Sequence, residues 1–211
     1  MVRVKICGIT SITDALSAAE CGTDALGFIF YPKSPRYVPP EKAKEIIQKL
    51  PREMTRVGVF VNQKIQEVKE VARFCDLSLI QLHGDESPRY CSKLPGFSLI
   101  KAVSPQTESD ILKLREYPVG AILVDAYEPG RYGGTGKISD WGLAIKVKKT
   151  HLLILSGGLN AENIREAIET VRPHAVDINS GVEISPGKKD PDKIRRIMEV
   201  VREIGQKGQN T

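Results

Sequence analysis

The sequence has no long apolar run, and this shortage excludes a membrane-spanning protein. Its longest apolar stretch, even with glycine counted as apolar, is Ala25–Tyr31, far short of the roughly 20 residues that cross a bilayer. The amino-terminal residues enter strand-like sequence without an extended apolar signal region, which argues against secretion. We therefore expect a cytoplasmic protein with no membrane partner.

Cysteine and histidine are also scarce, and their spacing provides no metal site. Cys7, Cys21, Cys75 and Cys91 are separated by 14, 54 and 16 positions and form no CxxC pair. A structural zinc site usually shows closely spaced ligand pairs, so no metal is expected. The four thiols are typical of a reduced, cytosolic protein.

Aromatic residues make up only 6% of the chain, and no basic run is interleaved with them. The net charge is +5, but residues 186–211 hold seven Lys/Arg and four Asp/Glu, so +3 of the excess belongs to this last segment. A solvated cationic helix face explains such a segment. Nucleic acid is therefore not expected as a partner.

What is present is an ordinary globular composition, with 41% apolar and 27% charged residues in 211 positions. This length suits one α/β barrel better than two domains. We expect one domain over residues 1–205 and a frayed tail over 206–211.

Apolar runs typical of buried strands alternate along the chain with stretches of helical periodicity, such as residues 40–50 and 160–171. A strand, a helix and two loops use about 24 residues, so the length accommodates eight such units. The pattern predicts a (β/α)₈ TIM barrel. The expected strands are Val2–Ile9, Ala25–Phe30, Thr55–Val61, Leu79–Leu82, Ser98–Val103, Ala121–Asp125, Leu152–Leu155 and Ala175–Ile178.

A doubly wound sheet is the alternative fold, because it also alternates strands and helices. It normally uses fewer strands, and no GxGxxG follows a strand here. The glycine-rich residues 130–139 do not form a P-loop, because Arg131 and Ile138 stand where that motif needs Gly and Ser/Thr. The barrel is the favoured fold.

In such a barrel, the active site lies at the carboxyl ends of the strands, so polar residues there are the candidates. Two glycine turns in this position, Ser156–Leu159 and Asn179–Val182, would present backbone N–H groups to an anion. The loops after the seventh and eighth strands are the usual phosphate cradle of this fold. Tight turns without a ligand are the alternative. The full candidate set is Cys7, Arg36, Gln81, His83, Lys101, Asp125, Asp177, Asn179 and Ser180.

Four of these candidates have two interpretations each. Cys7 is either an inert apolar residue or a partly ionised thiol near a positive helix end, able to act as a base or nucleophile. Asp125 ends an apolar run, so it is either a hydrogen-bonded structural carboxylate or an acid kept protonated by its apolar surroundings. Arg36 is either a surface arginine or a residue that binds a carboxylate through two hydrogen bonds of its guanidinium. His83 contacts the substrate or lies on the rim.

Several motifs in order resemble the phosphoribosylanthranilate isomerase family of tryptophan biosynthesis, over about residues 2–189. The resemblance implies an Amadori rearrangement of N-(5-phosphoribosyl)anthranilate without metal or cofactor. The motifs are Lys5–Thr10, Gly27–Tyr31, Ser34–Tyr37, Val57–Val61, Gln81–Gly84, Val124–Asp125, Gly133–Gly136, Leu155–Leu159 and Asp177–Val182.

By this resemblance, Asp125 protonates the ring oxygen of the sugar, Cys7 removes the C2 proton, and Arg36 holds the anthranilate carboxylate. His83 and Asp177 line the site. Asn179 departs from the family, where many relatives have a serine. The phosphate would be bound by Gly157, Gly158, Ser180 and Gly181. The sequence leaves monomer and homodimer equally open.

Two other functions remain. Another phosphosugar barrel enzyme would share the phosphate cradle, but a synthase needs catalytic lysine and glutamate residues, and Lys101 alone does not supply them. An epimerase needs metal ligands, and a single histidine at the mouth is too few. A non-catalytic anion-binding module would leave the expected acid and base unexplained.

Overall fold

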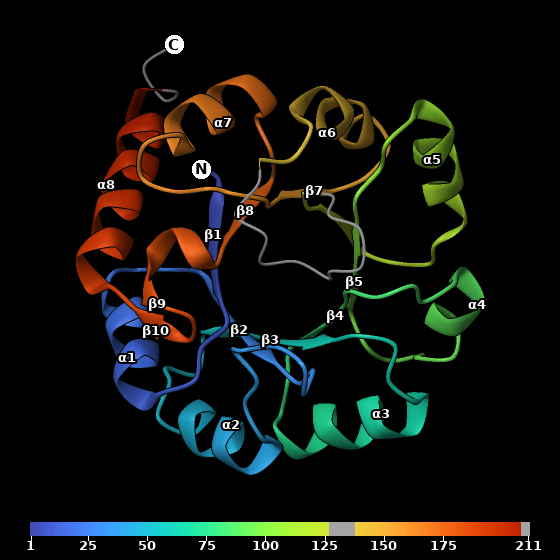
Figure 1. Cartoon of the computed structure of the whole chain (residues 1–211), viewed down its shortest axis with the longest axis horizontal. Helices are drawn as coiled ribbons and strands as arrows, with labels where there is room; N and C mark the ends of the chain where they lie inside the picture. Colours follow the sequence, from blue (N-terminus) through green and yellow to red (C-terminus); the bar gives the residue numbers. More distant parts are fainter. Residues whose placement is uncertain (127–137, 208–211) are drawn as a thin grey trace.

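The computed structural model describes residues 1–126 and 138–207, and these form the predicted TIM barrel. Eight parallel strands close in chain order, with β1 paired to β8 (Figure 1). Both faces of each strand are covered, which explains the apolar runs. The strands are β1 (Arg3–Cys7), β2 (Ala25–Ile29), β3 (Thr55–Phe60), β4 (Leu79–Leu82), β5 (Leu99–Val103), β6 (Ala121–Val124), β7 (Leu153–Leu155) and β8 (Ala175–Ile178).

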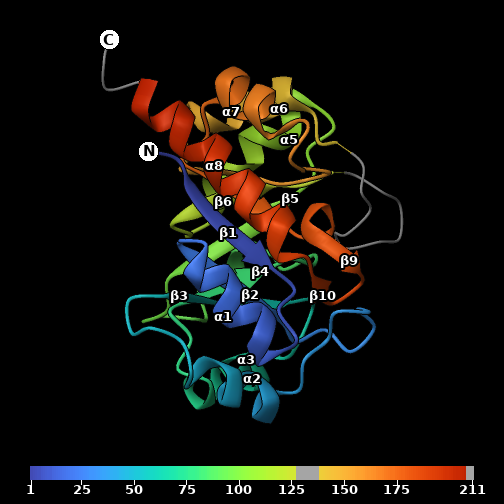
Figure 2. The ribbon, with the colours of Figure 1, turned by 90° about the vertical axis from the view of Figure 1, so that its left-hand side faces the viewer.

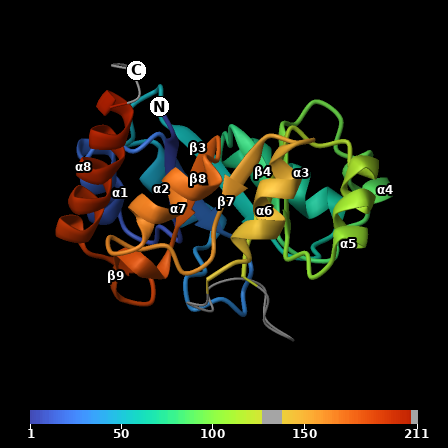
Figure 3. The ribbon, with the colours of Figure 1, turned by 90° about the horizontal axis from the view of Figure 1, so that it is seen from above.

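Helices surround the barrel. Helix α8 packs against α1 and α7, so the last helix closes the ring beside the first (Figure 2), and α6 and α7 lie outside β7 and β8 (Figure 3). The helices are α1 (Ile12–Glu20), α2 (Pro40–Ile47), α3 (Ile65–Phe74), α4 (Pro88–Cys91), α5 (Glu108–Lys113), α6 (Trp141–Lys148), α7 (Ile164–Val171) and α8 (Pro191–Lys207), with 3₁₀ turns η1 (Leu114–Glu116) and η2 (Ser180–Val182).

The strands agree with the sequence prediction in number and order; β4 and β8 have the predicted bounds, and the ends of the others differ by at most two residues. Strand β1, for example, is Arg3–Cys7 rather than Val2–Ile9. Helix α8 continues through Lys207, two residues into the expected tail; residues 208–211 lie outside the described residues. The sequence analysis missed a small hairpin after β8, formed by β9 (Glu183–Ser185) and β10 (Lys188–Lys189).

Two small clusters fill the barrel lumen, apart from the larger core between strands and helices. One cluster consists of Val57, Ile100, Ala102 and Leu123. The other cluster consists of Cys7, Ile29 and Val59, with Tyr31 packed against it. Cys7 therefore belongs to the lumen at the carboxyl end of the strands, where this fold places its chemistry.

Within the described residues, no helix combines the length and apolar character needed to cross a membrane. The same part of the chain contains no group of three or more His, Cys, Asp or Glu residues that could hold a metal ion. The glycine-rich residues 130–136, including the Gly133–Gly136 motif, lie outside the described residues.

Candidate active site

The predicted acid and base both lie at the carboxyl ends of barrel strands. Cys7 is the last residue of β1, and Asp125 directly follows β6. Strands β7 and β8 separate β6 from β1 in the closed barrel, so the two side chains come from different parts of the same rim. Both residues are buried.

Asp125 belongs to a chain of three side chains. Its Oδ2 lies 3.2 Å from His83 Nε2, and its Oδ1 accepts a hydrogen bond from the Ala126 N–H at 2.8 Å. Gln81 Nε2 lies 2.9 Å from the other ring nitrogen of His83. An amide donor at Nδ1 favours the tautomer with hydrogen on Nε2. His83 thus donates toward Asp125 rather than standing alone on the rim.

Asp177 forms an ion pair in the lumen with Lys5, which the sequence analysis did not single out. The two residues are directly paired between β8 and β1, and Lys5 Nζ lies 2.8 Å from Asp177 Oδ1. Both side chains are about 5% exposed. The sequence feature that could have identified Lys5 is a lysine inside an apolar strand, two positions before Cys7. Residues two apart on a strand have their side chains on the same face.

Burial raises the pKa of the Cys7 thiol above its usual value, although the neighbouring Lys5 charge opposes the shift. Of the two interpretations of Cys7, the ionised thiol therefore needs support from charges beyond a helix end. Desolvation disfavours the charged form, and it outweighs the nearby cation here. Burial therefore favours the neutral thiol of Cys7 over the thiolate.

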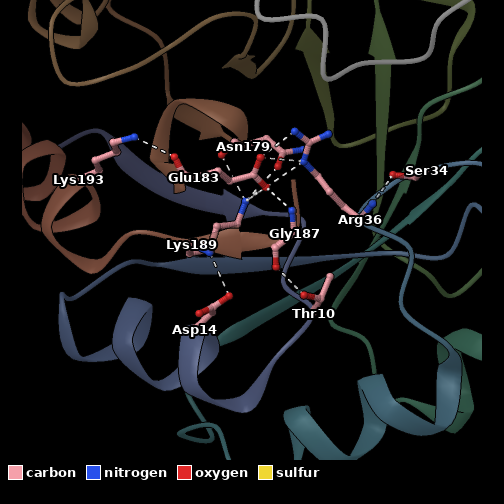
Figure 4. A network of polar contacts seen from close by, with 9 residues as sticks. All are labelled: Thr10, Asp14, Ser34, Arg36, Asn179, Glu183, Gly187, Lys189 and Lys193. Atoms are coloured by element: carbon pink, nitrogen blue, oxygen red, sulfur yellow. Dashed lines mark hydrogen bonds and ion pairs between the residues drawn. The ribbon is translucent and has the colours of Figure 1, made fainter. Parts of the chain in front are cut away.

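Arg36 faces a carboxylate of its own chain. Its Nε lies 2.9 Å from Glu183 Oε1 and its Nη2 lies 2.7 Å from Oε2, a two-pronged ion pair (Figure 4). Lys189 Nζ also contacts Glu183 Oε1, at 2.8 Å, and is almost fully buried. Glu183 and Lys189 were missed because both lie in the unpredicted hairpin.

This cluster ties the β9–β10 hairpin to the barrel rim (Figure 4). Lys189 Nζ donates to Asn179 Oδ1 at 3.0 Å, and the Gly187 N–H donates to Glu183 Oε1 at 3.1 Å. Thr10 Oγ1 donates to the Gly187 carbonyl at 2.6 Å. The hairpin is thus held to the loop after β1 and to the end of β8.

Two cations share one carboxylate in this cluster, so Arg36, Lys189 and Glu183 together carry one excess positive charge. Burial alone would raise the pKa of Glu183, but the Arg36 hydrogen bonds and the Lys189 charge lower it below the usual value. Burial lowers the pKa of Lys189, against the attraction of Glu183. The excess charge suits an anionic ligand.

The glycines predicted to bind phosphate lie in two touching turns. Gly157 and Gly158 have φ values of +89° and +61°, which glycine adopts without strain. A Cβ on Gly181 would lie 1.9 Å from the Leu159 carbonyl oxygen, so the turns after β7 and β8 pack backbone to backbone. Within the described residues, no turn or loop hydrogen bond uses the N–H of Gly158.

Comparison with known proteins gives a consistent result. The family model described as N-(5'-phosphoribosyl)anthranilate (PRA) isomerase matches residues 4–200. A relative of that name from Syntrophus aciditrophicus is 56% identical over 202 residues, covering 96% of this chain and 88% of the relative.

Two solved structures are similar over 96% of this chain and all of theirs. One is a phosphoribosyl anthranilate isomerase in complex with reduced 1-(o-carboxyphenylamino)-1-deoxyribulose 5-phosphate, with 45% identity and a TM-score of 0.85. The other is described as monomers generated from the dimeric enzyme of Thermotoga maritima, with 44% identity and a TM-score of 0.85.

Proposed function

The chain belongs to the N-(5'-phosphoribosyl)anthranilate isomerase family, an isomerase family of tryptophan biosynthesis, and we propose that Asp125 and Cys7 carry out its two proton transfers. The reaction converts an aminoaldose into an aminoketose by an Amadori rearrangement. It needs an acid to open the sugar ring and a base to remove the C2 proton, and the barrel rim offers one group for each.

Asp125 acts first, by donating a proton to the furanose ring oxygen. The ring C–O bond breaks and the nitrogen lone pair forms the Schiff base at C1. The carboxylate that remains is stabilised by the hydrogen bonds from His83 Nε2 and the Ala126 N–H. These donors offset the negative charge that develops on Asp125 as its proton leaves.

Cys7 acts second, as the base. Its thiolate takes the C2 proton, and the C–H electron pair moves to form the C1–C2 double bond while the cationic nitrogen of the Schiff base becomes neutral. The resulting enolamine tautomerises to the ketone, with a proton arriving at C1. The proton count balances, because the thiol formed at Cys7 returns its proton to C1, and the proton lost from the enol O–H restores the carboxyl of Asp125.

Arg36 binds the carboxylate of the anthranilate ring. Glu183 occupies Nε and Nη2, and an arginine has five N–H donors, so hydrogens on Nη1 and Nη2 are left for the ligand. The excess positive charge of the cluster becomes neutralised when this carboxylate arrives. His83 acts through its contact with Asp125, whereas Asp177 is paired with Lys5 and does not bind the substrate directly.

The phosphate lies on the backbone N–H groups of the two glycine turns. Gly157, Gly158, Ser180 and Gly181 bring these turns together after β7 and β8, where the fold commonly holds a phosphate. No side-chain cation is needed, because oriented N–H dipoles bind anions well at such turns.

The single observation that carries the proposal is the position of Cys7 and Asp125 on one rim of the barrel, at the end of β1 and directly after β6. Arg36 and the two glycine turns, the groups proposed to bind the two anionic parts of the substrate, belong to the same rim. The direct test supplies freshly made N-(5-phosphoribosyl)anthranilate to the purified chain and identifies the product, which has the same mass as the substrate, by NMR, because the ketone carbon of an aminoketose is distinct from the anomeric carbon of the substrate. We expect the aminoketose. If another phosphosugar is turned over instead, a different barrel activity applies, and binding without conversion points to an anion-binding module.

The remaining features stay proposals. Both monomer and homodimer are open for this chain, and the Thermotoga maritima relative is described as dimeric. A cytoplasmic location, with no nucleic-acid or membrane partner, remains a prediction from the sequence.

A further inference from the structure

Lys5 and Cys7 occupy neighbouring positions on the inner face of β1. They are two residues apart on one strand, so their side chains leave the same face. A Cβ on Gly27, the β2 partner of Cys7, would lie 2.7 Å from Cys7 Sγ and 3.1 Å from Lys5 Cε. The thiol and the lysine side chain therefore converge over a position that only glycine leaves open.

Asp177 fixes Lys5 in this place. Its Oδ1 lies 2.8 Å from Lys5 Nζ, and the two residues face each other in the β1–β8 register. A buried ion pair adds little net stability because desolvation offsets the attraction. The proposed acid and base steps use neither Lys5 nor Asp177, although this pair lies beside Cys7, the proposed base.

We propose that Lys5, anchored by Asp177, is a positioning residue for Cys7, whose ammonium stabilises the thiolate that takes the C2 proton. Lys5 keeps its proton throughout, so the proton balance of the reaction is unchanged. The inference rests on the proposed role of Cys7 as base.

The charges around Cys7 support this role. Burial is the largest influence and raises the pKa of Cys7, and the Lys5 ammonium is the strongest opposing charge. Asp177 on β8 raises this pKa further, and Lys189 on β10 lowers it. Removing Lys5 thus removes the main electrostatic support of the thiolate.

Lys5 itself is unsuited to act as the base or as an imine-forming nucleophile. Burial alone would lower the pKa of Lys5, but the charges of Asp177 and Cys7 and hydrogen bonds to both raise it above the usual value. A lysine must be deprotonated for either role. Lys5 therefore serves as a fixed cation.

The test measures Cys7 ionisation in the absence of substrate. The ultraviolet thiolate absorbance of each protein is titrated against pH, and the signal of the same protein carrying Cys7→Ala is subtracted. Tyrosines and the other three thiols cancel in this difference. The proteins are wild type, Lys5→Met, which keeps length but removes charge, and Lys5→Arg, which keeps the charge.

Lys101→Met is the matched control. Lys101 is another almost fully buried lysine paired with a carboxylate, with Nζ 2.9 Å from Glu86 Oε2, but it lies on β5 and its charge acts on Cys91 rather than Cys7. General damage from losing a buried ion pair would appear in this variant as well.

We expect Lys5→Met to raise the Cys7 pKa by about one unit or more, which is a roughly tenfold smaller thiolate fraction at a fixed pH below the midpoint. The rising limb of kcat/KM against pH should move by the same amount. Lys5→Arg should stay close to wild type, and Lys101→Met should leave the Cys7 titration unchanged.

An unchanged Cys7 titration in folded Lys5→Met overturns the inference, as does an equal shift in Lys101→Met. If Lys5→Met does not fold, the double variant Lys5→Met/Asp177→Asn removes both charges and leaves no unpaired buried ion. It should show a smaller rise in the Cys7 pKa, and no rise again overturns the inference. Loss of the base role would appear separately, as near-normal turnover in Cys7→Ala.

Discussion

Arg36 and Glu183, 147 residues apart in the chain, share a buried two-pronged ion pair with Nε–Oε1 and Nη2–Oε2 distances of 2.9 and 2.7 Å. This geometry fixes the plane of the guanidinium, because the fork can satisfy both carboxylate oxygens in only one orientation. The β9–β10 hairpin, which supplies Glu183, therefore determines how the guanidinium of Arg36 is oriented at the barrel rim.

Glu183→Gln should weaken substrate binding more than turnover. The glutamine amide keeps one oxygen that can accept a hydrogen bond from Arg36 but loses the negative charge and the second acceptor. The guanidinium is therefore oriented less firmly. We expect KM to rise about tenfold, the cost of one weakened charge-assisted hydrogen bond, with a smaller change in kcat. Exposed Glu199→Gln on α8 is the control. A fall in kcat at unchanged KM would contradict the orienting role.

Glu183 should also contribute to stability above acidic pH. Its pKa is lowered in the folded protein, so it favours folding above the unfolded value of about 4.3, and this contribution is lost as the pH falls through the folded pKa. Urea unfolding at a series of pH values should show a steeper loss below about pH 5 in wild type than in Glu183→Gln. Parallel curves would show that Glu183 titrates equally in both states.

Cys7→Ala and Asp125→Asn should each lower kcat by roughly 10²-fold or more, the usual contribution of a positioned acid or base, while the fold is retained. The change is confined to the proton-transfer step, so substrate should still bind. Steady-state kinetics with circular dichroism as the folding check provide the measurement. Near-wild-type turnover in either variant would remove that residue from the mechanism.

Much of the fold was predictable because it depends on local pattern. Buried parallel strands are apolar on both faces, and their repetition with helices predicts a closed barrel in the observed order. The ends of strands were less predictable. Ile9, for example, is buried and apolar and still donates its N–H to the Gly27 carbonyl of β2, yet it lies beyond the end of β1, because Gly8 with a φ of +76° ends the extended backbone.

The candidate site was predictable only where a residue's position at the end of a strand marked it as a candidate. Cys7 and Asp125 end strands, and the glycine turns follow strands, so fold knowledge alone selects them. Glu183 and Lys189 lie in a hairpin that has no apolar periodicity, and their partner Arg36 is distant in sequence. Lys5 required the β1–β8 register, which a sequence does not show.

Activity should survive prolonged treatment with a strong chelator. The proposed steps use only a carboxyl, a thiol and hydrogen-bond donors, so no step needs a metal as Lewis acid. The chain is treated with the chelator, freed of it by gel filtration, and assayed beside untreated protein, with an unrelated metalloenzyme as a positive control for stripping. A loss of turnover that added metal restores would refute the metal-free mechanism.

Gly181→Ala should weaken phosphate binding, because its Cβ would lie 1.9 Å from the Leu159 carbonyl oxygen and must push the two anion-binding turns apart. We expect KM to rise about tenfold or more with a moderate loss of stability, since backbone on both sides must move. Inorganic phosphate should also compete less well with substrate in this variant. Gly120→Ala is the matched control, since its Cβ would meet only the Leu99 carbonyl oxygen at an ordinary 3.6 Å. Equal phosphate inhibition constants in Gly181→Ala and wild type would place the phosphate elsewhere on the rim.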